Sequence, residues 1–273
     1  MITSTANQQV KQLVQLNKKA KLRSERDVFV VEGLKMFGEA PQERIEKVYF
    51  SESYFEKNYG KAEAFESKCQ GNASGTSRDL TGIIYEVVQD SVFKTMCDTQ
   101  TPQGVLCLVK QYHYTLDELL KKENPLFLVL ENLQDPGNLG TIMRTAEGAG
   151  VTGVILSKGS VDIYNPKNIR STMGSIYRVP FLYEEDLKAV LKTLKDQGVK
   201  SYAAHLAGKQ TYDKENYQGG TAFLIGNESN GLSKELAGAA DIYIRIPMEG
   251  KLESLNAGVA ASILMYEAYR QRR

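Results

Sequence analysis

The second half of the chain alternates between apolar runs and amphipathic stretches. Runs with the length and composition of buried strands are Pro125–Asn132, Thr152–Ser157, Lys200–His205, Thr221–Glu228 and Ile242–Met248. Stretches with helical spacing are Leu139–Ala149, Asn168–Ser175, Glu184–Gln197 and the long final Leu255–Arg270. Apolar runs separated by helices indicate an α/β fold with a mostly parallel sheet that is covered on both faces.

The first 110 residues predict a smaller α/β domain. The opening stretch has apolar residues spaced as one helix face, namely Val10, Leu13, Val14 and Leu16. Strands are expected at Phe29–Gly33, Ile45–Phe50, Ile83–Val88 and Gly104–Lys110. Helices are expected at Glu52–Lys68 and Asp90–Cys97, and a polar loop at Gln70–Arg78. The polar segment 111–124, closed by Pro125, is typical of a boundary, so we expect two domains, 1–112 and 113–273.

Composition and charge exclude several classes of protein. The net charge of +1 over 273 residues excludes a histone-like polycation but leaves room for a local basic face. Cys69, Cys97 and Cys107 form no CxxC pair, which argues against a disulfide framework and a cysteine zinc site. His113 and His205 are too few for a histidine metal centre, so no metal is expected.

No membrane or export segment is expected. The opening MITSTANQQVKQ has no apolar core of the kind a signal peptide needs. Moreover, no run approaches the roughly 20 apolar residues of a membrane helix. We therefore expect a reduced, cytoplasmic protein.

The N-terminal forty residues carry a basic cluster. Its members are Lys11, Lys18, Lys19, Lys21, Arg23 and Arg26. One interpretation is a solvated helix face; the other is a surface for nucleic-acid phosphates.

A glycine motif at Gly148–Gly153 fits GxGxxG but is not interpreted as a nucleotide site. A dinucleotide fingerprint follows a strand and opens a helix, whereas these glycines close a helix and precede a strand. They predict a helix C-terminus and a tight turn.

The segment Glu131–Gly150 follows the first predicted strand of the larger domain. Asp135–Gly137 predicts a turn, after which Asn138 is suited to cap a helix. The apolar stripe of that helix is Leu139, Ile142, Met143 and Ala146. Arg144 lies off the stripe and is either a surface salt-bridge residue or a ligand-binding residue. A helix that starts at the carboxyl end of a parallel strand lies where such sheets bind ligands.

The segment Phe223–Leu236 runs from a strand into a glycine-rich turn. Gly226 would let a ligand approach the backbone closely. Glu228 is either a functional carboxylate or a residue that satisfies a helix end. Ser233 is expected to cap the next helix.

The segment Ile244–Arg273 begins with a strand that ends at Pro247. Ser254 is the expected N-cap of the last helix. The small residues of that helix, Ala257, Gly258, Ala260 and Ala261, permit close approach of another backbone, within the chain or across a subunit interface.

Together, and in this order, the three segments resemble the three motifs of the SpoU/TrmH-type RNA ribose 2′-O-methyltransferases of the SPOUT superfamily. The resemblance extends from about Leu126 to the C-terminus. The opening ITSTANQQVKQL, the FVVEG strand and Thr101–Gly104 resemble the same family's RNA substrate-binding domain. One departure is Ser229, where many members have glycine.

The resemblance implies a fold, a cofactor and partners. It implies a small N-terminal α/β RNA-binding domain and a SPOUT domain with a C-terminal trefoil knot. It further implies a homodimer that binds S-adenosylmethionine and methylates a ribose 2′-hydroxyl of structured RNA, with ribosomal RNA as the expected substrate.

The resemblance also implies site residues. The cofactor pocket would be lined by Gly226, Asn227, Ile246, Met248, Ser254, Leu255, Asn256, Ala204 and His205. The catalytic residues would be Asn138, Arg144, Glu228 and Asn256. Because an arginine hardly deprotonates in proteins, we interpret Arg144 as a forked clamp on the phosphate beside the target ribose. Glu228 and Asn138 would orient it, and Asn256 would tie the cofactor loop to the site. The basic cluster, Arg144 and the tail Arg270–Arg273 would contact RNA phosphates.

Alternatives remain open on the same scaffold. They are a non-enzymatic RNA-binding or ribosome-assembly factor, a transfer-RNA ribose methyltransferase, and a methyltransferase acting on a base nitrogen. A nicotinamide-dependent oxidoreductase is disfavoured because its fingerprint is missing from the required place.

Overall fold

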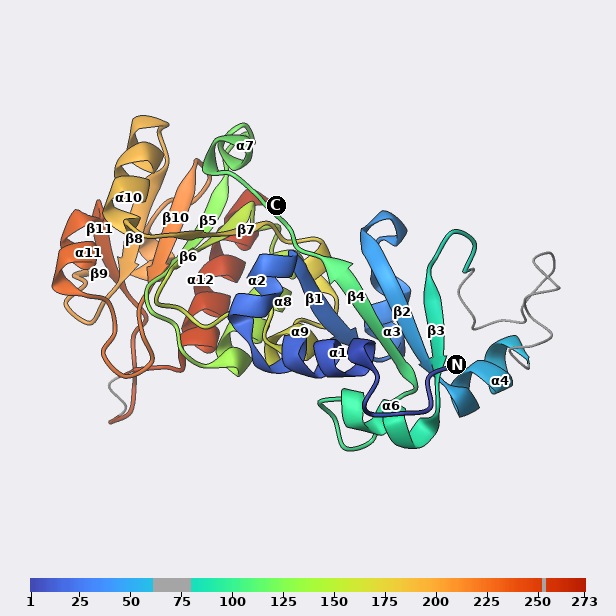
Figure 1. The fold of residues 1–273 in the computed structure, drawn as a ribbon. Coiled ribbons are helices and arrows are strands. Elements are labelled where there is room, and N and C mark those ends of the chain that lie inside the picture. The colour runs from blue at the N-terminus through green and yellow to red at the C-terminus, as the bar shows by residue number, and fades with distance from the viewer. Residues whose placement is uncertain (61–79, 252–253) are drawn as a thin grey trace. The chain divides into compact units, whose positions relative to one another are not determined.

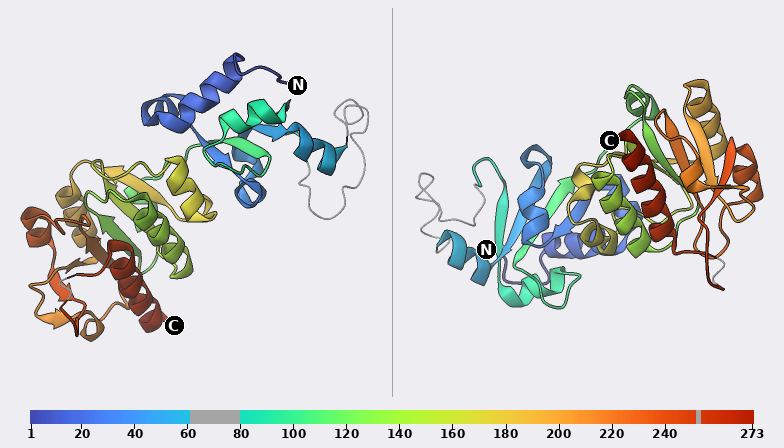
Figure 2. Two further views of the ribbon diagram at one scale, coloured as in Figure 1. Left: turned by 90° about the horizontal axis from the view of Figure 1, so that it is seen from below. Right: turned by 180° about the vertical axis from the view of Figure 1, so that it is seen from behind.

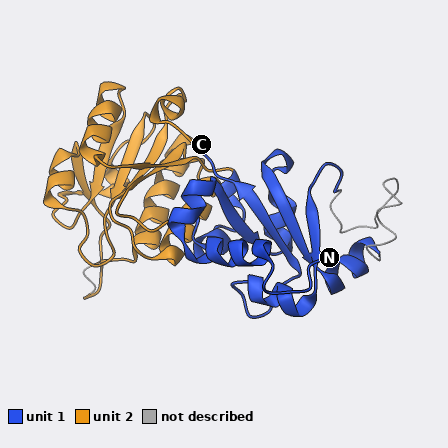
Figure 3. Cartoon of the chain, viewed as in Figure 1, with its two compact units in different colours: residues 1–112, 164–177 blue, residues 113–163, 178–273 orange. Residues whose placement is uncertain are grey.

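The computed structural model describes residues 1–60, 80–251 and 254–273. The chain divides into two compact units, one of residues 1–112 with 164–177 and one of 113–163 with 178–273 (Figure 3). The domains expected from the sequence differ from these units in residues 164–177, which pack with the first unit. Tyr164 there stacks on Phe29 with ring centroids 4.7 Å apart, and the hydroxyl of Tyr177 donates to the Met36 carbonyl.

The described part of the first unit is built on a four-stranded sheet with the order β1-β4-β2-β3 (Figure 1). The strands are β1 (Val28–Glu32), β2 (Ile45–Ser51), β3 (Tyr85–Val88) and β4 (Val105–Lys110). Strand β4 is antiparallel to both β1 and β2, and β2 is parallel to β3. The helices are α1 (Gln8–Lys18), α2 (Ala20–Arg26), α3 (Leu34–Glu39), α4 (Glu52–Tyr59), α6 (Asp90–Met96) and α9 (Pro166–Thr172), with 3₁₀ turns η1 (Gln42–Arg44) and η2 (Ser175–Tyr177).

The predicted N-terminal helix is confirmed. Val10, Leu13 and Leu16 are buried against strand residues such as Val30 and Leu108, while Val14 is half-buried. The helix predicted at Glu52–Lys68 begins at Glu52 as expected, but α4 ends at Tyr59, where Gly60 with φ 86° is the C-cap. Residues 61–68, and the loop predicted at Gln70–Arg78, lie outside the described residues.

The second unit, over its described residues, has a seven-stranded sheet in which every neighbouring pair is parallel. The order is β7-β6-β5-β10-β8-β11-β9. The strands are β5 (Leu126–Leu130), β6 (Gly153–Ser157), β7 (Phe181–Glu184), β8 (Lys200–Ala204), β9 (Gln210–Thr211), β10 (Thr221–Ile225) and β11 (Ile242–Arg245). The helices are α7 (Leu116–Leu120), α8 (Pro136–Gly148), α10 (Leu187–Asp196), α11 (Lys234–Ala239) and α12 (Ala257–Arg272), with a 3₁₀ turn η3 (Tyr212–Lys214).

Helices cover this sheet in two pairs. Helices α8 and α12 lie side by side (Figure 2), and α12 also packs on β10. Helices α10 and α11 contact each other and bury Leu191, Leu194 and Leu236 in a core shared with the strands. The parallel, two-sided sheet expected from the sequence is therefore confirmed.

The sequence missed several elements of this unit, among them β7, α7 and the short strand β9. A helix is predicted to start at Glu184, but Glu184 is the last residue of strand β7. Helix α10 starts later, at Leu187, because the Asp186 side chain caps it by accepting from the backbone N–H groups of Lys188 and Ala189. Helix α7 lies in the segment taken as a polar linker. It is started by a capping box in which Thr115 and Glu118 bond each other's backbone.

The order of the strands places two motifs side by side. From β5 the chain moves outward to β6 and β7, then crosses to the other side for β8, and β10 later inserts between β5 and β8. Leu130 and Ile225, the last residues of β5 and β10, are register partners. The segments that follow both strands therefore emerge together at the carboxyl edge, at the type of switch point where parallel sheets bind ligands.

The described residues contain no helix long and apolar enough to cross a membrane.

Arg23 does not belong to the exposed basic cluster that the sequence predicts. Its side chain is 3 % exposed and donates to the carbonyls of Leu16 and Asn17 at the end of α1. The last carbonyls of a helix lack partners within the helix, and the guanidinium folds back to satisfy them. Arg23 therefore joins α1 to α2 and does not face RNA.

Replacing Arg23 tests this structural role. Arg23→Ala should lower the free energy of unfolding by about 2 kcal/mol, because two inward-facing carbonyls lose their donor. It should also speed amide hydrogen exchange in α1 and α2. The exposed neighbour Lys19 is the matched control, and Lys19→Ala should change stability by less than about 0.5 kcal/mol. Equal stability of the two variants would contradict the assignment.

Candidate functional site

A chain of hydrogen bonds joins the three motif segments at Asn138. The Asn138 amide nitrogen donates to a carboxylate oxygen of Glu228 at 2.9 Å. The Asn256 amide nitrogen donates to the Asn138 amide oxygen at 2.8 Å. Asn138 is 7 % exposed, so this junction is largely shielded from water. Residues about 90 and 118 positions distant in the sequence thus meet at one side chain.

The chemistry of the partners fixes the orientation of both amides. An ionised carboxylate can only accept, so Asn138 must turn its nitrogen toward Glu228 and its oxygen toward Asn256. The Asn256 oxygen in turn accepts from the backbone of Gly258 at 2.9 Å and Val259 at 3.3 Å. No other arrangement of the two amides satisfies all these groups.

Glu228 is held as a carboxylate. Besides the Asn138 amide, the backbone N–H groups of Gln134 and Asp135 donate to it at 3.1 and 2.9 Å. Burial raises the pKa of this carboxyl, but the three donors outweigh burial and hold the pKa below its ordinary value of 4.5. A carboxylate with a lowered pKa is a weak base, which suits it to positioning groups rather than to accepting a proton.

The helix caps differ from those expected. Asp135, not Asn138, caps α8 by accepting from the Asn138 backbone at 2.8 Å, and Pro136 occupies the first helical position, where its missing N–H costs nothing. Asn256, not Ser254, caps α12. Each shift frees a side chain for the site: Asn138 for the junction and Ser254 for the adjacent cavity.

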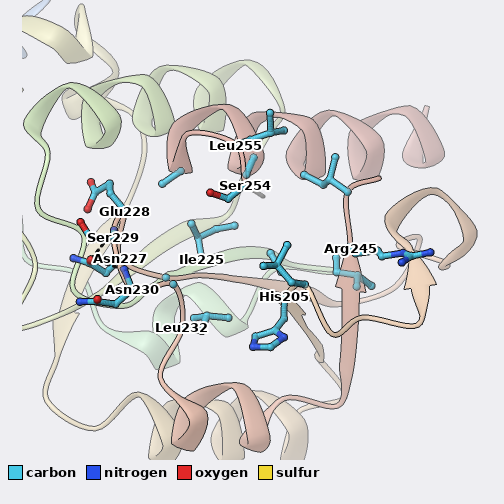
Figure 4. Close-up of a pocket in the computed structure, with 18 of the residues that line it drawn as sticks. His205, Ile225, Asn227, Glu228, Ser229, Asn230, Leu232, Arg245, Ser254 and Leu255 are labelled. Atoms are coloured by element: carbon cyan, nitrogen blue, oxygen red, sulfur yellow. Dashed lines mark hydrogen bonds between the residues drawn. The ribbon is translucent and has the colours of Figure 1, made fainter. Parts of the chain in front are cut away.

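A cavity of about 330 Å³ lies beside this junction, in the size range of small-molecule sites (Figure 4). It contains Glu228 and almost all the side chains that the resemblance assigned to the cofactor: Gly226, Asn227, Ile246, Met248, Ser254, Leu255, Ala204 and His205. Asn227 and Glu228 lie at one end and Arg245 at the other, with Ser254 and Leu255 along one side. Asn256 is not part of the lining, because its amide is turned toward Asn138.

Two lining residues act differently from what was expected. A Cβ at Gly226 would lie 2.0 Å from the Gly231 carbonyl carbon, so Gly226 permits close approach of the chain's own backbone. The Asn227 side chain is committed at both ends: its nitrogen donates to the Asn132 carbonyl at 2.8 Å, and its oxygen accepts from the backbone of Ser229 and Asn230. Asn227 therefore shapes the loop, and a ligand would meet its backbone and carbon atoms.

Sequence reasoning missed part of the lining. The additional residues are Leu206, Ile225, Ser229, Asn230, Gly231, Leu232, Ile244, Arg245, Ala257 and Ala260. Half of them, namely Leu206, Ile225, Ser229, Arg245 and Ala257, are direct neighbours of predicted residues, so the site extends beyond the predicted motif boundaries. Ala257 and Ala260, two of the small residues of α12, line the cavity, and Gly258 lets α12 approach α8 closely. A Cβ at Gly258 would lie 3.4 Å from the Thr141 Cβ on α8.

Arg144 is not brought into the cavity. It is exposed on α8 and is absent from the residues that line the cavity. Within the described residues, no hydrogen bond or salt bridge engages its guanidinium.

The other members of the N-terminal basic cluster differ in whether their charge is paired. Lys11, Lys18 and Lys19 are exposed. Lys21 forms a salt bridge with Glu25, and Arg26 forms one with Glu46.

The C-terminal arginines are largely engaged within the chain. Arg270 makes a two-pronged bond to Glu267. Arg272 donates to the carbonyls of Tyr217, Asn124 and Gly219. The tail therefore holds the loop before β10 and offers fewer free charges than its sequence suggested.

Comparison with known proteins decides the family. The SpoU rRNA Methylase family model matches residues 125–266, and the MRM3-like substrate binding domain model matches residues 7–107. The chain belongs to the SpoU rRNA methylase family. The resemblance inferred from the sequence is confirmed, and with it an S-adenosylmethionine-dependent RNA methyltransferase.

Individual relatives agree with this assignment. The chain is 34% identical over 186 residues to 23S rRNA (guanosine(2553)-2′-O)-methyltransferase RlmP of Bacillus subtilis (strain 168), covering 68% of this chain and 73% of that protein. An AdoMet-bound rRNA methyltransferase from Sinorhizobium meliloti is 30% identical, with a TM-score of 0.81 over 98% of this chain and 97% of that one. An RNA 2′-O ribose methyltransferase, also 30% identical, has a TM-score of 0.77 over 99% and 98%.

Substitution of Asn138 in this SpoU methylase tests the junction. Asn138→Ala should lower the free energy of unfolding by about 1–3 kcal/mol, because Glu228 loses a donor and Asn256 an acceptor. Asn138→Asp should be worse despite its similar size, because it places a second carboxylate against Glu228. Urea unfolding and calorimetric titration with S-adenosylmethionine measure both effects. The control is Gln197→Ala, since Gln197 is exposed at a helix end and its side chain makes no hydrogen bond to any residue that the structure describes. Junction variants as stable as this control would contradict the network.

The lowered pKa of Glu228 predicts a pH dependence of stability. The folded-state pKa lies below the unfolded one, so the stabilisation is present above the unfolded pKa and is lost as pH falls through the folded pKa. The difference in unfolding free energy between wild type and Glu228→Gln should therefore be constant from pH 7 to about pH 5.5 and shrink below about pH 4.5. A difference that is independent of pH down to about pH 3 would refute it.

Proposed function

We propose that this SpoU methylase transfers a methyl group from S-adenosylmethionine to a ribose 2′-hydroxyl of ribosomal RNA. The observation that carries the proposal is the Asn138 junction, which joins all three motif segments beside a cavity lined by two of them. The name of the relative from Bacillus subtilis supports ribosomal RNA as the substrate and the ribose 2′-oxygen as the methyl acceptor. The name of one of the similar solved structures also supports the ribose as the acceptor.

The cavity suits the proposed cofactor. Its lining combines apolar side chains such as Ile225, Leu232 and Met248 with backbone from the Gly226–Gly231 loop. Such a cleft can hold an adenine ring through backbone groups and apolar contact. The cofactor supplies a methyl group on a positively charged sulfur. The acceptor hydroxyl must also release its proton, which passes to water because Glu228 is a weak base. The remaining requirement is orientation, which can contribute on the order of 7–11 kcal/mol.

The junction residues would supply that orientation. Glu228 holds the backbone of Gln134 and Asp135 in place and thereby fixes the start of α8. Asn256 links the start of α12 to the same point. We infer that these residues fix the donor loop and the acceptor hydroxyl relative to one another, and that Arg144 clamps the phosphate beside the target ribose.

The first unit would bind the RNA. Its match to a substrate-binding domain supports this role, and we assign residues 1–112 to RNA binding and 113–273 to methyl transfer. Lys11, Lys18 and Lys19 are the best placed of the basic cluster to contact phosphates. An enzyme of ribosomal RNA works where ribosomes are built, so we place it in the cytoplasm.

We also infer a homodimer and a trefoil knot. Val259 and Tyr266 on α12 are 45% and 50% exposed, and together with Tyr269 they leave an apolar face suited to a second copy. The knot is supported by a tight backbone approach between distant segments: a Cβ at Gly208 would lie 2.7 Å from the Ile244 carbonyl carbon.

Mapping of ribose methylations tests the proposed function. Deleting the gene should remove one or a few 2′-O-methyl groups from ribosomal RNA, and the purified protein should restore them with tritium-labelled S-adenosylmethionine. Label that appears in transfer RNA or on a base nitrogen would replace the proposed substrate. RNA binding without any transfer would favour an assembly factor.

Arg144 variants test the phosphate clamp. Arg144→Ala should abolish methyl transfer yet leave the affinity for S-adenosylmethionine nearly unchanged, because the side chain lies outside the cavity. Arg144→Lys should restore little activity, since lysine is a point charge and cannot make two parallel bonds. Full activity of Arg144→Lys would show that two-pronged geometry is not required, and full activity of Arg144→Ala would remove Arg144 from the mechanism.

A further inference from the structure

A second cavity, of about 350 Å³, lies at the same carboxyl edge of the sheet in the second unit. It is formed where the chain leaves β5, β6 and β7, and by the first turns of α10 and α11. This edge is where parallel sheets place their ligands. The function proposed above does not use this cavity.

One loop separates this cavity from the cavity proposed to bind S-adenosylmethionine, which we call the donor cavity. Residues Asn227–Leu232 line the donor cavity, and Ser233 lines the second. Both ends of the loop are bonded to the residues that follow β5. The Glu131 carboxylate accepts from the Ser233 backbone and hydroxyl, both at 2.7 Å, and the Asn132 carbonyl accepts from Asn227.

Gln134 connects the second cavity to the Glu228 carboxylate. Its backbone N–H donates to Glu228 at 3.1 Å, and its side chain donates to the carbonyl of Gly159, a residue of the second cavity, at 2.7 Å. The second cavity therefore borders the segment around Glu228 that is proposed to position the ribose.

The charges of the cavity favour a neutral ligand with donors and acceptors. Two lysines and four carboxylates line it: Lys158, Lys188, Glu131, Glu185, Asp186 and Glu235. The excess of carboxylates disfavours a phosphate. At its rim the ammonium of Lys158 and the carboxylate of Glu185, both exposed, form an ion pair, so a strong donor and a strong acceptor stand side by side.

We propose that this cavity receives the base of the target nucleotide, and that Lys158 and Glu185 recognise a base with a ring N–H beside a keto oxygen. Guanine and uracil have this pattern, so Lys158 can donate to the keto oxygen while Glu185 accepts from the ring N–H. Adenine and cytosine instead present an amino group beside an unprotonated ring nitrogen. Proteins commonly read RNA through such splayed-out bases. The inference rests on the proposed methylation of RNA.

Methyl transfer to RNAs that differ at the target base tests the proposal. The wild-type protein should methylate RNA with guanine or uracil at the mapped position at least about tenfold faster, in kcat/KM, than RNA with adenine or cytosine. Glu185→Gln and Lys158→Met should each lower kcat/KM for the preferred RNA about tenfold and reduce the preference between bases. Affinity for S-adenosylmethionine should stay within twofold, because neither residue lines the donor cavity.

Lys192→Met is the matched control, since Lys192 is exposed on α10 one turn beyond Lys188 and does not line the cavity. It should behave as wild type. Glu185 and Lys158 variants with unchanged kcat/KM and unchanged base preference would overturn the inference while wild-type transfer to the ribose upholds the proposed function. No transfer by the wild-type protein to any RNA would overturn both.

Discussion

One side-chain amide, that of Asn138, holds together segments that are far apart in the chain. It can do so because an amide carries a donor and an acceptor a short distance apart, one for the Glu228 carboxylate and one for the Asn256 amide. Aspartate has no donor, and alanine has neither group. The amide is in place because Asp135 caps α8 and leaves the Asn138 side chain unused by its own helix. The donor cavity depends on this junction, because Glu228 and Asn256 belong to the two segments that line the cavity and both are bonded to Asn138.

The sheet brings those segments together, and its outline was predictable in part. Strongly apolar runs that alternate with helical segments predict β5, β6, β8, β10 and β11. Because these strands are parallel, their carboxyl ends lie at one edge of the sheet. Their order was not predictable from the pattern. Strands β5, β6 and β10 are buried along their whole length, so nothing in the side chains of β10 tells whether it pairs with β8, β11 or β5. The resemblance to a known family, and not periodicity, supplied the meeting of the three motifs.

The errors in reading the site have physical causes. Asn138 and Ser254 are good caps, but a better-placed Asp135 and Asn256 lie within three residues, and sequence alone does not show which side chain reaches the backbone. Arg23 lies among lysines that face water, yet α1 ends just before it and the exposed carbonyls of that end attract it inward. The position of Arg144 in the first motif predicts a role in the site. The fold leaves it on an exposed helix face outside the cavity, so its role stays a proposal.

The insertion of β10 between β5 and β8 also constrains how the chain can fold during its synthesis. Strands β5, β6 and β7 can pair as soon as they have been made, because they are neighbours in both sequence and sheet. Strand β8 then has no partner to join until residues 221–225 follow it. Strand β11 can add only to β8, and β9 pairs only with β11. Non-local pairing of this kind is slow, and unpaired apolar strands are prone to aggregate. The half of the sheet that contains the donor cavity is therefore completed last, and a nascent chain that stalls before β10 exposes its most apolar edge.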